Sequence, residues 1–385
     1  MYKIKTLNKI SKPGLDLLES FGCTTGDDLE KPDALLVRSA KLHDMKFDPD
    51  TVCIARAGAG VNNIPIDRCT EEGIVVFNTP GANAEAVKEL ALCALLLASR
   101  DVIGGVEWVR GLTEDGVAAA VEKGKSAFVG PELMGKTLGV IGLGAVGAKI
   151  ANAAISLGMT VYGYDPYLSV NAAWMLSSCI IPAQDLDTIY RCCDYLTLHV
   201  PYLDSTHHML NADAFTKMKK GVRIINLARA ELVDDNAMLD ALQNGMVSRY
   251  VTDFPNDVTA HAAGIVPLPH LGASTPESEE KCALMAARDL NDYLKNGNIN
   301  HSVNLPNVSL ERMGVARLCV IHRNVPRMIN GFLDLIGEKN INVEHMINKP
   351  RGEYAYTIID TGSELDQEII DKIKQMNEVL RVRVI

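Results

Sequence analysis

Short apolar runs alternate with a helix-length stretch through the first hundred positions. The segments 33–40 (DALLVRSA), 51–60 (TVCIARAGAG) and 73–81 (GIVVFNTPG) each contain a short apolar run that leads into a loop. Such runs predict buried β-strands. The stretch 84–100 has the length and composition of a well-buried helix. Strands that alternate with helices predict a parallel sheet covered on both faces.

A complete strand–helix–strand unit is predicted between 135 and 167. A strand over 138–141 leads into a glycine loop, a helix follows to about residue 157, and a second strand ends at Asp165. Further elements of the same kind are expected downstream: strands at 195–201, 221–229 and 248–254, and helices at 235–245 and 279–297.

The chain after a polar linker at 301–314 has a different rhythm. Its segments follow the order strand, helix, strand, strand, helix, strand, which is that of a ferredoxin-like fold. At 385 residues the chain is also too long for one ordinary core. We therefore expect an α/β protein with two doubly wound parallel-sheet domains and a small ferredoxin-like domain.

The composition excludes several classes of protein. A net charge of −10 without a run of Lys or Arg argues against nucleic acid and membrane as partners. The apolar run at 90–98 is far shorter than the roughly 20 residues of a membrane-spanning helix, and the start of the chain lacks the apolar core of a signal peptide. The 9 cysteines show no metal-ligand spacing, so we expect reduced thiols, no metal and a cytoplasmic protein.

Gly142, Gly144 and Gly147 form a G-x-G-x-x-G motif, which alone is a weak signal because an ordinary glycine turn can produce it. Here the motif follows a predicted strand, opens a predicted helix and precedes an acidic residue, Asp165, at the end of the next strand. That context indicates a dinucleotide site, with Asp165 on the ribose hydroxyls, where it would repel the 2′-phosphate of NADP. We therefore expect NAD as the cofactor, and we expect Ala145 and Val146 to bind it together with the three glycines and Asp165.

A dinucleotide site implies hydride transfer, which needs a proton partner and a group that holds the substrate. Arg229 follows a predicted buried strand in INLARAELVDD, where open parallel sheets place their ligands, and it could clamp a substrate carboxylate. His270, in PHLGAST, could act as acid and base. Asp257 is a carboxylate that could orient His270. A histidine taken alone is more often structural than catalytic, and its nearness in the pattern to Arg229 and Asp257 favours the catalytic interpretation.

These motifs, in this order, resemble the NAD-dependent D-2-hydroxyacid dehydrogenases, and the likeness covers residues 1–310. The resemblance implies that Arg229 binds the substrate carboxylate and that His270 is the acid/base. Asp257 stands where the family has a glutamate that pairs with the histidine. Its side chain is shorter, so the loop must bring it closer if the pair is to form.

The resemblance also implies further contacts. Asp253 would lie near the nicotinamide, and Ala228, Gly272 and Ala273 would line the cofactor. The segments VRSA, ARAGAGVNNI and NTPGANAEAVKEL resemble a branch of the family with a phosphorylated substrate, which requires added positive charge and donors. The substrate-binding residues that we expect from these segments are Arg38, Arg56, Gly58 and Asn83.

A discontinuous arrangement follows from the same resemblance. Residues 1–97 and 275–310 would form a substrate domain, 98–274 the NAD-binding domain, and 315–385 a regulatory or oligomerisation domain. Members of the family are generally homodimers or homotetramers, and we expect the same here.

The segment 317–385 resembles an ACT domain, which in related dehydrogenases binds serine. His322, Asn324 and Asn342 match the positions that hold serine there, but Arg327 replaces a glycine of the effector loop. Glycine suits a loop in which backbone meets ligand, and arginine adds bulk and charge. A dimerisation module without serine control is therefore slightly favoured over serine inhibition.

Three functional hypotheses result. The first is NAD-dependent oxidation of a phosphorylated D-2-hydroxy acid at the entry to serine synthesis. The second is reduction of hydroxypyruvate or glyoxylate by the same residues. The third, from another class, is an NAD-sensing binding protein that resembles a corepressor, against which the pair Arg229 and His270 argues.

Overall fold

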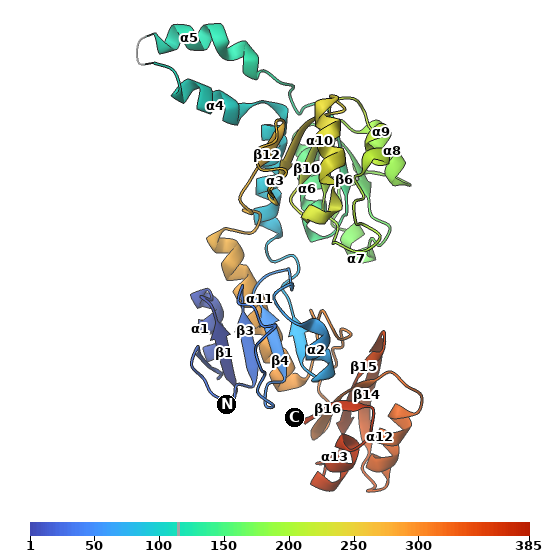
Figure 1. Cartoon of the computed structure of the whole chain (residues 1–385). Coiled ribbons are helices and arrows are strands. Elements are labelled where there is room, and N and C mark those ends of the chain that lie inside the picture. Colours follow the sequence, from blue (N-terminus) through green and yellow to red (C-terminus); the bar gives the residue numbers. More distant parts are fainter. Residues whose placement is uncertain (114–115) are drawn as a thin grey trace. The chain divides into compact units, whose positions relative to one another are not determined.

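The computed structural model describes residues 1–113 and 116–385, except for the side chain of Asn171. The chain forms two compact units (Figure 1). The first unit comprises Met1–Asn83 and Pro276–Ile385, and the second comprises Ala84–Thr275. No helix of the described residues is long and apolar enough to cross a membrane.

The first unit contains a five-stranded parallel sheet in the order β2-β1-β3-β4-β5. The apolar runs predicted as strands form β3, β4 and β5. Alternate residues of these strands point to opposite faces, where α1 and α11 cover one face and α2 lies on the other. The elements are β1 (Lys3–Leu7), α1 (Lys12–Ser20), β2 (Thr24–Gly26), β3 (Ala34–Val37), β4 (Cys53–Arg56), α2 (Ile66–Glu71), β5 (Val75–Phe77) and α11 (Pro276–Asn296).

Within the described residues of the second unit, seven strands form a parallel sheet in the order β12-β11-β10-β9-β6-β7-β8. Helices α3 and α6 pack on one face, and α8, α9 and α10 pack on the other. The strands are β6 (Thr137–Ile141), β7 (Thr160–Tyr164), β8 (Ile181–Pro182), β9 (Tyr195–Leu198), β10 (Val222–Asn226), β11 (Val247–Thr252) and β12 (Ile265–Pro267). The predicted doubly wound fold is confirmed for both units.

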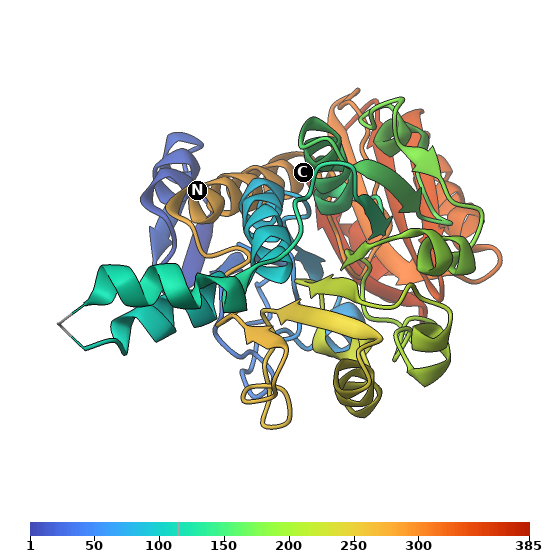
Figure 2. The same ribbon diagram turned by 90° about the horizontal axis from the view of Figure 1, so that it is seen from above.

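The helices of the second unit precede the first strand or follow individual strands. They are α3 (Ala84–Ser99), α4 (Val102–Arg110), α5 (Val117–Gly124), η1 (Lys125–Phe128), α6 (Ala145–Ser156), α7 (Val170–Ala173), α8 (Leu186–Cys192), α9 (Ala212–Thr216), η2 (Ala230–Leu232) and α10 (Asp235–Gln243). Both views show α4 and α5 side by side, extending from the body of this unit (Figures 1 and 2).

The boundary between the units differs from the expected one. Helix α3 was expected in the substrate domain, up to residue 97, but its buried residues Val87, Ala91 and Leu95 pack with Leu138 of β6. The change of unit therefore falls between Asn83 and Ala84, and the return falls between Thr275 and Pro276. Because α3 is apolar on several faces, its sequence does not reveal which sheet it covers.

The C-terminal segment folds as β13 (Ala316–Arg323), α12 (Met328–Gly337), β14 (Val343–Arg351), β15 (Tyr354–Thr361), α13 (Gln367–Lys374) and β16 (Val379–Val384). The strands form an antiparallel sheet in the order β14-β15-β13-β16, as the ferredoxin-like pattern predicts. Both helices pack against one face. From the other face, Cys319 and Tyr356 join the core that contains Cys53 and Tyr293, so this segment is part of the first unit.

Candidate active site

The glycine loop of the second unit lies directly after β6. Gly142 has φ +91°, and a Cβ atom there would lie 2.5 Å from the carbonyl oxygen of His199. A Cβ atom on Gly147 would lie 1.9 Å from the carbonyl oxygen of Gly142. By contrast, a Cβ atom on Gly144 would have no neighbour within 4 Å. Two glycines are therefore required by packing, and the third leaves open space beside the loop.

Helix α6 begins at this open space. Gly144 occupies the N-cap position and provides no side chain to cap the helix. The amide groups of Ala145, Val146 and Gly147 have no acceptor within the helix, because the first intrahelical bond is donated by Ala148 to the Gly144 carbonyl. Free amides at the positive end of a helix dipole suit a pyrophosphate, so these residues fit a dinucleotide.

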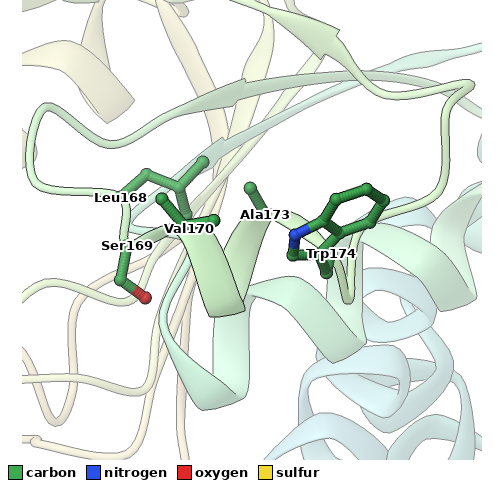
Figure 3. Close-up of a pocket in the computed structure, with 5 residues that line it drawn as sticks. All are labelled: Leu168, Ser169, Val170, Ala173 and Trp174. Atoms are coloured by element: carbon green, nitrogen blue, oxygen red, sulfur yellow. The ribbon is translucent and has the colours of Figure 1, made fainter.

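Asp165 follows β7 and faces the same loop. Its Oδ2 accepts the Leu143 amide at 2.9 Å, and its Oδ1 accepts the Tyr167 amide at 2.9 Å. These two bonds fix the carboxylate beside the glycine loop, as ribose recognition requires. Residues that follow Asp165 line an apolar pocket of about 450 Å³ (Figure 3). They are Leu168, Ser169, Val170, Ala173 and the exposed Trp174.

Arg229 lies just past the end of β10. The buried side chain of Asn226 fixes the loop, since it donates to the Arg229 carbonyl at 2.8 Å and accepts the Ala228 amide at 3.1 Å. The Arg229 side chain is exposed and donates to the Ala228 carbonyl at 2.6 Å. Among the described residues, no carboxylate forms an ion pair with it. The arginine is thus available to an external anion.

Asp253 is the buried carboxylate of this region. Its Oδ2 accepts the Gly272 amide at 3.2 Å, while its Oδ1 is buried and has no hydrogen-bond partner among the described residues. Burial raises the pKa of Asp253, and the Gly272 amide and the positive charges of His270 and Arg229 oppose that shift. Asp253 therefore lies within electrostatic reach of both residues proposed for chemistry.

His270 is exposed after β12, and its backbone has φ +48°. Its ring packs against Phe254, with 4.6 Å between the ring centroids. Asp257 is also exposed, and in the part of the chain that the structure describes no hydrogen bond or ion pair joins it to His270. The pairing of Asp257 with His270 stays a prediction, whereas Asp253 has an electrostatic interaction with the histidine.

The strand order arranges these residues along one edge of the sheet. Asp253, Arg229, Gly142 and Asp165 follow the C-terminal ends of β11, β10, β6 and β7, and β9 lies between β10 and β6. Four strand spacings separate β11 from β7, which corresponds to about 19 Å. An extended dinucleotide can therefore lie along this edge, with its ribose at Asp165 and its other end at Asp253 and His270.

His199 was missed as a site residue, although it lies within the predicted strand at 195–201 and directly follows β9. Its carbonyl oxygen lies so close to Gly142 that it leaves no room for a Cβ atom there. Its Nε2 is hydrogen-bonded to Thr197 Oγ1 at 2.8 Å. Burial lowers the pKa of His199 to about 3, so its ring is neutral at physiological pH. The residue shapes the glycine loop without adding charge to it.

The residues expected to bind substrate lie in the first unit. Arg38 and Arg56 stand at the C-terminal ends of the adjacent strands β3 and β4. The Arg56 Nε donates to the Arg38 carbonyl at 2.9 Å, and its Nη1 donates to the Gly60 carbonyl. A Cβ atom on Gly58 would lie 3.0 Å from Arg56 Nη1. The structure thus brings Arg38, Arg56 and Gly58 together, and Asn83 is the last residue before α3.

Arg38 has a partner that the sequence did not suggest. Its Nη2 lies 2.7 Å from Oε1 of Glu279, in the first turn of α11. The two residues are far apart in the chain and share no motif, so no sequence pattern could have paired them. Arg38, which we expected to bind a substrate anion, is thus paired with the carboxylate of Glu279.

The residues expected to hold serine are separated within one chain. His322 is buried, with Nδ1 donating to the Arg323 carbonyl at 2.7 Å and Nε2 hydrogen-bonded to Thr357 Oγ1 at 2.9 Å. His322 pairs with Ala355 at the start of β15, whereas Asn342 lies beside the other end of that strand. Asn324 donates to the Gly352 carbonyl at 3.3 Å.

Arg327 adopts the conformation for which glycine is suited. Its φ of +72° is left-handed, and the residue is the N-cap of α12. An arginine is strained in this conformation, a cost that the bulk and charge expected from the sequence did not include.

The chain is similar to known proteins over most of its length. Residues 92–272 match the family model "D-isomer specific 2-hydroxyacid dehydrogenase, NAD binding domain". A D-3-phosphoglycerate dehydrogenase from Bacillus subtilis is 32% identical in an alignment 331 residues long that covers 80% of this chain and 59% of that protein. The relative of that name from Haemophilus influenzae is 32% identical in an alignment 352 residues long that covers 88% of this chain and 82% of that protein. The chain thus spans less than two thirds of the Bacillus relative and most of the Haemophilus one.

Solved structures give the same result. The NAD⁺-bound 3-phosphoglycerate dehydrogenase of Entamoeba histolytica aligns with a TM-score of 0.62 and 25% identity, covering 79% of this chain and 98% of that one. The D-mandelate dehydrogenase of Rhodotorula graminis shares the fold, with a TM-score of 0.67 and 20% identity over 80% of this chain and 99% of that one. The family model for an NAD-binding domain and the NAD⁺-bound structure confirm NAD as the cofactor. The chain belongs to the family of D-isomer-specific 2-hydroxyacid dehydrogenases.

Proposed function

We propose that the protein catalyses the NAD-dependent oxidation of D-3-phosphoglycerate to 3-phosphohydroxypyruvate, the first step of serine synthesis. The observation that carries the proposal is the position of Arg229 and His270 around the buried Asp253, at the end of a sheet edge that fits NAD. The substrate is inferred from the names of the relatives that cover most of this chain.

Each residue has one task in this proposal. Bound NAD would accept the hydride from C2 of the substrate. His270 takes the proton of the C2 hydroxyl as general base, and it returns a proton in the reverse reaction. Arg229 holds the neighbouring carboxylate with two parallel N–H donors, which fixes the position of C2. The negative charge of Asp253 favours the protonated imidazole that results.

The substrate phosphate is assigned to the first unit. Arg38 and Arg56 lie at the C-terminal ends of adjacent parallel strands, the edge at which sheets of this kind bind ligands. Gly58 keeps the backbone clear beside Arg56, and Asn83 adds an amide donor.

Substrate specificity decides between this proposal and the alternatives. We would measure NADH oxidation with 3-phosphohydroxypyruvate, hydroxypyruvate, glyoxylate and 2-oxoglutarate. The expected result is a kcat/KM at least tenfold higher for the phosphorylated acid, since charge-assisted bonds to a phosphate contribute about 1.5–3 kcal/mol each. Equal rates on unphosphorylated acids would leave a general 2-hydroxyacid reductase. Tight NADH binding without turnover would leave a binding protein.

We further propose that the C-terminal segment does not make the protein sensitive to serine. Both ring nitrogens of His322 are already engaged, and Arg327 holds the loop position that suits glycine. Activity with 3-phosphohydroxypyruvate should be unchanged by millimolar serine. Inhibition would instead require that a second copy brings Asn342 to His322.

A homo-oligomer is proposed from the surface of α4. Val102, Ile103, Val106 and Val109 are exposed on this helix, which extends from the second unit (Figure 2). An exposed apolar stripe of this kind is typical of an interface. Light scattering of the purified protein should give a dimer or tetramer, and Val106→Glu should lower the mass.

A further inference from the structure

The arginine that the proposed function assigns to the substrate phosphate forms an ion pair with a carboxylate. Arg38 Nη2 and Glu279 Oε1 are 2.7 Å apart, and their side chains are 39% and 40% exposed. Both residues lie at the same end of the first unit, because Arg38 follows β3 and Glu279 stands in the first turn of α11. The ion pair is thus half-exposed and accessible to an anion from solution.

The pair is weak enough to be exchanged. Half-exposed ion pairs contribute little to stability, because water screens them and both side chains lose freedom. A guanidinium offers five N–H donors, and this contact uses a single nitrogen. A phosphate monoester carries about two negative charges at neutral pH and can accept two parallel bonds from arginine. It is therefore a stronger partner for Arg38 than the carboxylate.

We propose that Glu279 is an internal competitor for Arg38 and sets the affinity for the substrate phosphate, an inference that rests on the proposed function. The phosphate displaces the Glu279 carboxylate, which remains nearby and repels it. Glu279 is a specificity-determining residue, because its charge opposes every anion that enters but only a dianion gains enough from Arg38 to overcome it. Unphosphorylated acids are held by Arg229 in the second unit and do not depend on this exchange.

The charge of Glu279 can be removed without changing its shape. Glu279→Gln should lower the KM for 3-phosphohydroxypyruvate about three- to tenfold, as expected for one charge facing a dianion a few ångströms away in water. The kcat, and the KM for hydroxypyruvate, should be unchanged. The difference from the wild type should shrink as salt is raised, because screening weakens the repulsion. Glu279→Asp should behave like the wild type.

Glu277→Gln is the matched control. Glu277 lies in the same first turn of α11 and is exposed, so its replacement removes an equal charge from the helix end. This variant should keep the wild-type KM. An equal fall in KM in both variants would show a general charge effect, and an unchanged or higher KM in Glu279→Gln would show that the carboxylate does not compete.

A titration with inorganic phosphate separates this inference from the proposed function. Glu279→Gln should bind phosphate about three- to tenfold more tightly than the wild type, and Arg38→Gln should abolish that gain. If the wild type fails to turn over the phosphorylated acid, the proposed function fails and the titration still decides the competition. If the wild type turns over and the variant has unchanged KM and phosphate affinity, only the inference fails.

Discussion

Arg229 illustrates how one side chain is presented to a substrate. Asn226 fixes the backbone on both sides of it, and the guanidinium is exposed past the end of β10. We expect Arg229→Lys to raise the KM for the 2-keto acid tenfold or more, because an ammonium group cannot form two parallel bonds to a carboxylate. The Kd for NADH, measured by fluorescence, should not change. A lysine variant that binds the keto acid normally would remove Arg229 from this role.

Asp253 connects catalysis with stability. Because burial raises its pKa, the folded protein binds this proton more tightly than the unfolded chain, and stability falls as the pH rises through the folded pKa. Asp253→Asn removes the buried charge. We expect the variant to melt at a higher temperature than the wild type at neutral pH. The difference should shrink as the pH falls and disappear near pH 3, where Asp253 is largely protonated in the folded and the unfolded state.

The same variant should lose activity. Without the carboxylate, the imidazolium of His270 loses a nearby negative charge, so kcat/KM should fall by about ten- to a hundredfold. Asp257→Asn serves as the comparison. If it costs as much activity as Asp253→Asn, the predicted pair of Asp257 and His270 forms in the working enzyme. Calorimetry across pH 3–8 and steady-state kinetics at neutral pH would measure the two effects.

Residue-level interactions were only partly predictable. Gly142, Asp165 and Arg229 could be located because each follows an apolar run that ends at a sheet edge, and position along the chain then fixes position in space. Asp253 and Asp257 lie in one short loop, where burial rather than sequence decides which carboxylate is near His270. The pair of Arg38 and Glu279 depends on where α11 returns to the sheet, which no local pattern encodes.

At the scale of elements, β6, the glycine loop and α6 together form the predicted NAD-binding site. Gly144→Ala meets open space at φ −68°, so the fold should keep its stability, while the new methyl group should weaken NADH binding about tenfold. Gly147→Ala would place a Cβ atom 1.9 Å from a carbonyl oxygen, so it should lower the melting temperature and NADH affinity together. Thermal melts and NADH titrations would distinguish the two. Equal loss of stability in both would mean that Gly144 also serves packing.

Helix α3 shows why elements are easier to predict than their partners. Its length and apolar composition specified a buried helix correctly. Its assignment to a sheet failed, because a helix that is apolar on several faces fits either neighbour. The parallel sheets covered by helices, by contrast, followed from the repeated strand–helix pattern.

At the scale of the molecule, the C-terminal segment is built into the first unit by a buried ion pair. Arg317 and Asp360 are fully buried and joined by two hydrogen bonds of 2.6 and 2.7 Å. The Arg317 Nη1 also donates to the carbonyls of Asn296 at 2.8 Å and Leu310 at 3.0 Å, which ties β13 to the end of α11. The segment therefore should not unfold alone.

Replacing the two partners separately and together tests this integration. Arg317→Met leaves Asp360 buried without its cation and should cost about 3–5 kcal/mol in the free energy of unfolding. The double variant with Asp360→Leu should recover much of that loss, because two apolar side chains need no compensation. Urea unfolding of the wild type should show the first unit and its C-terminal segment melting in one transition. Hydrogen exchange would detect a separate early transition of residues 315–385. Such a transition would mean that the ion pair stabilises a domain that unfolds by itself, and that the packing of Tyr356 against the core that contains Tyr293 contributes little.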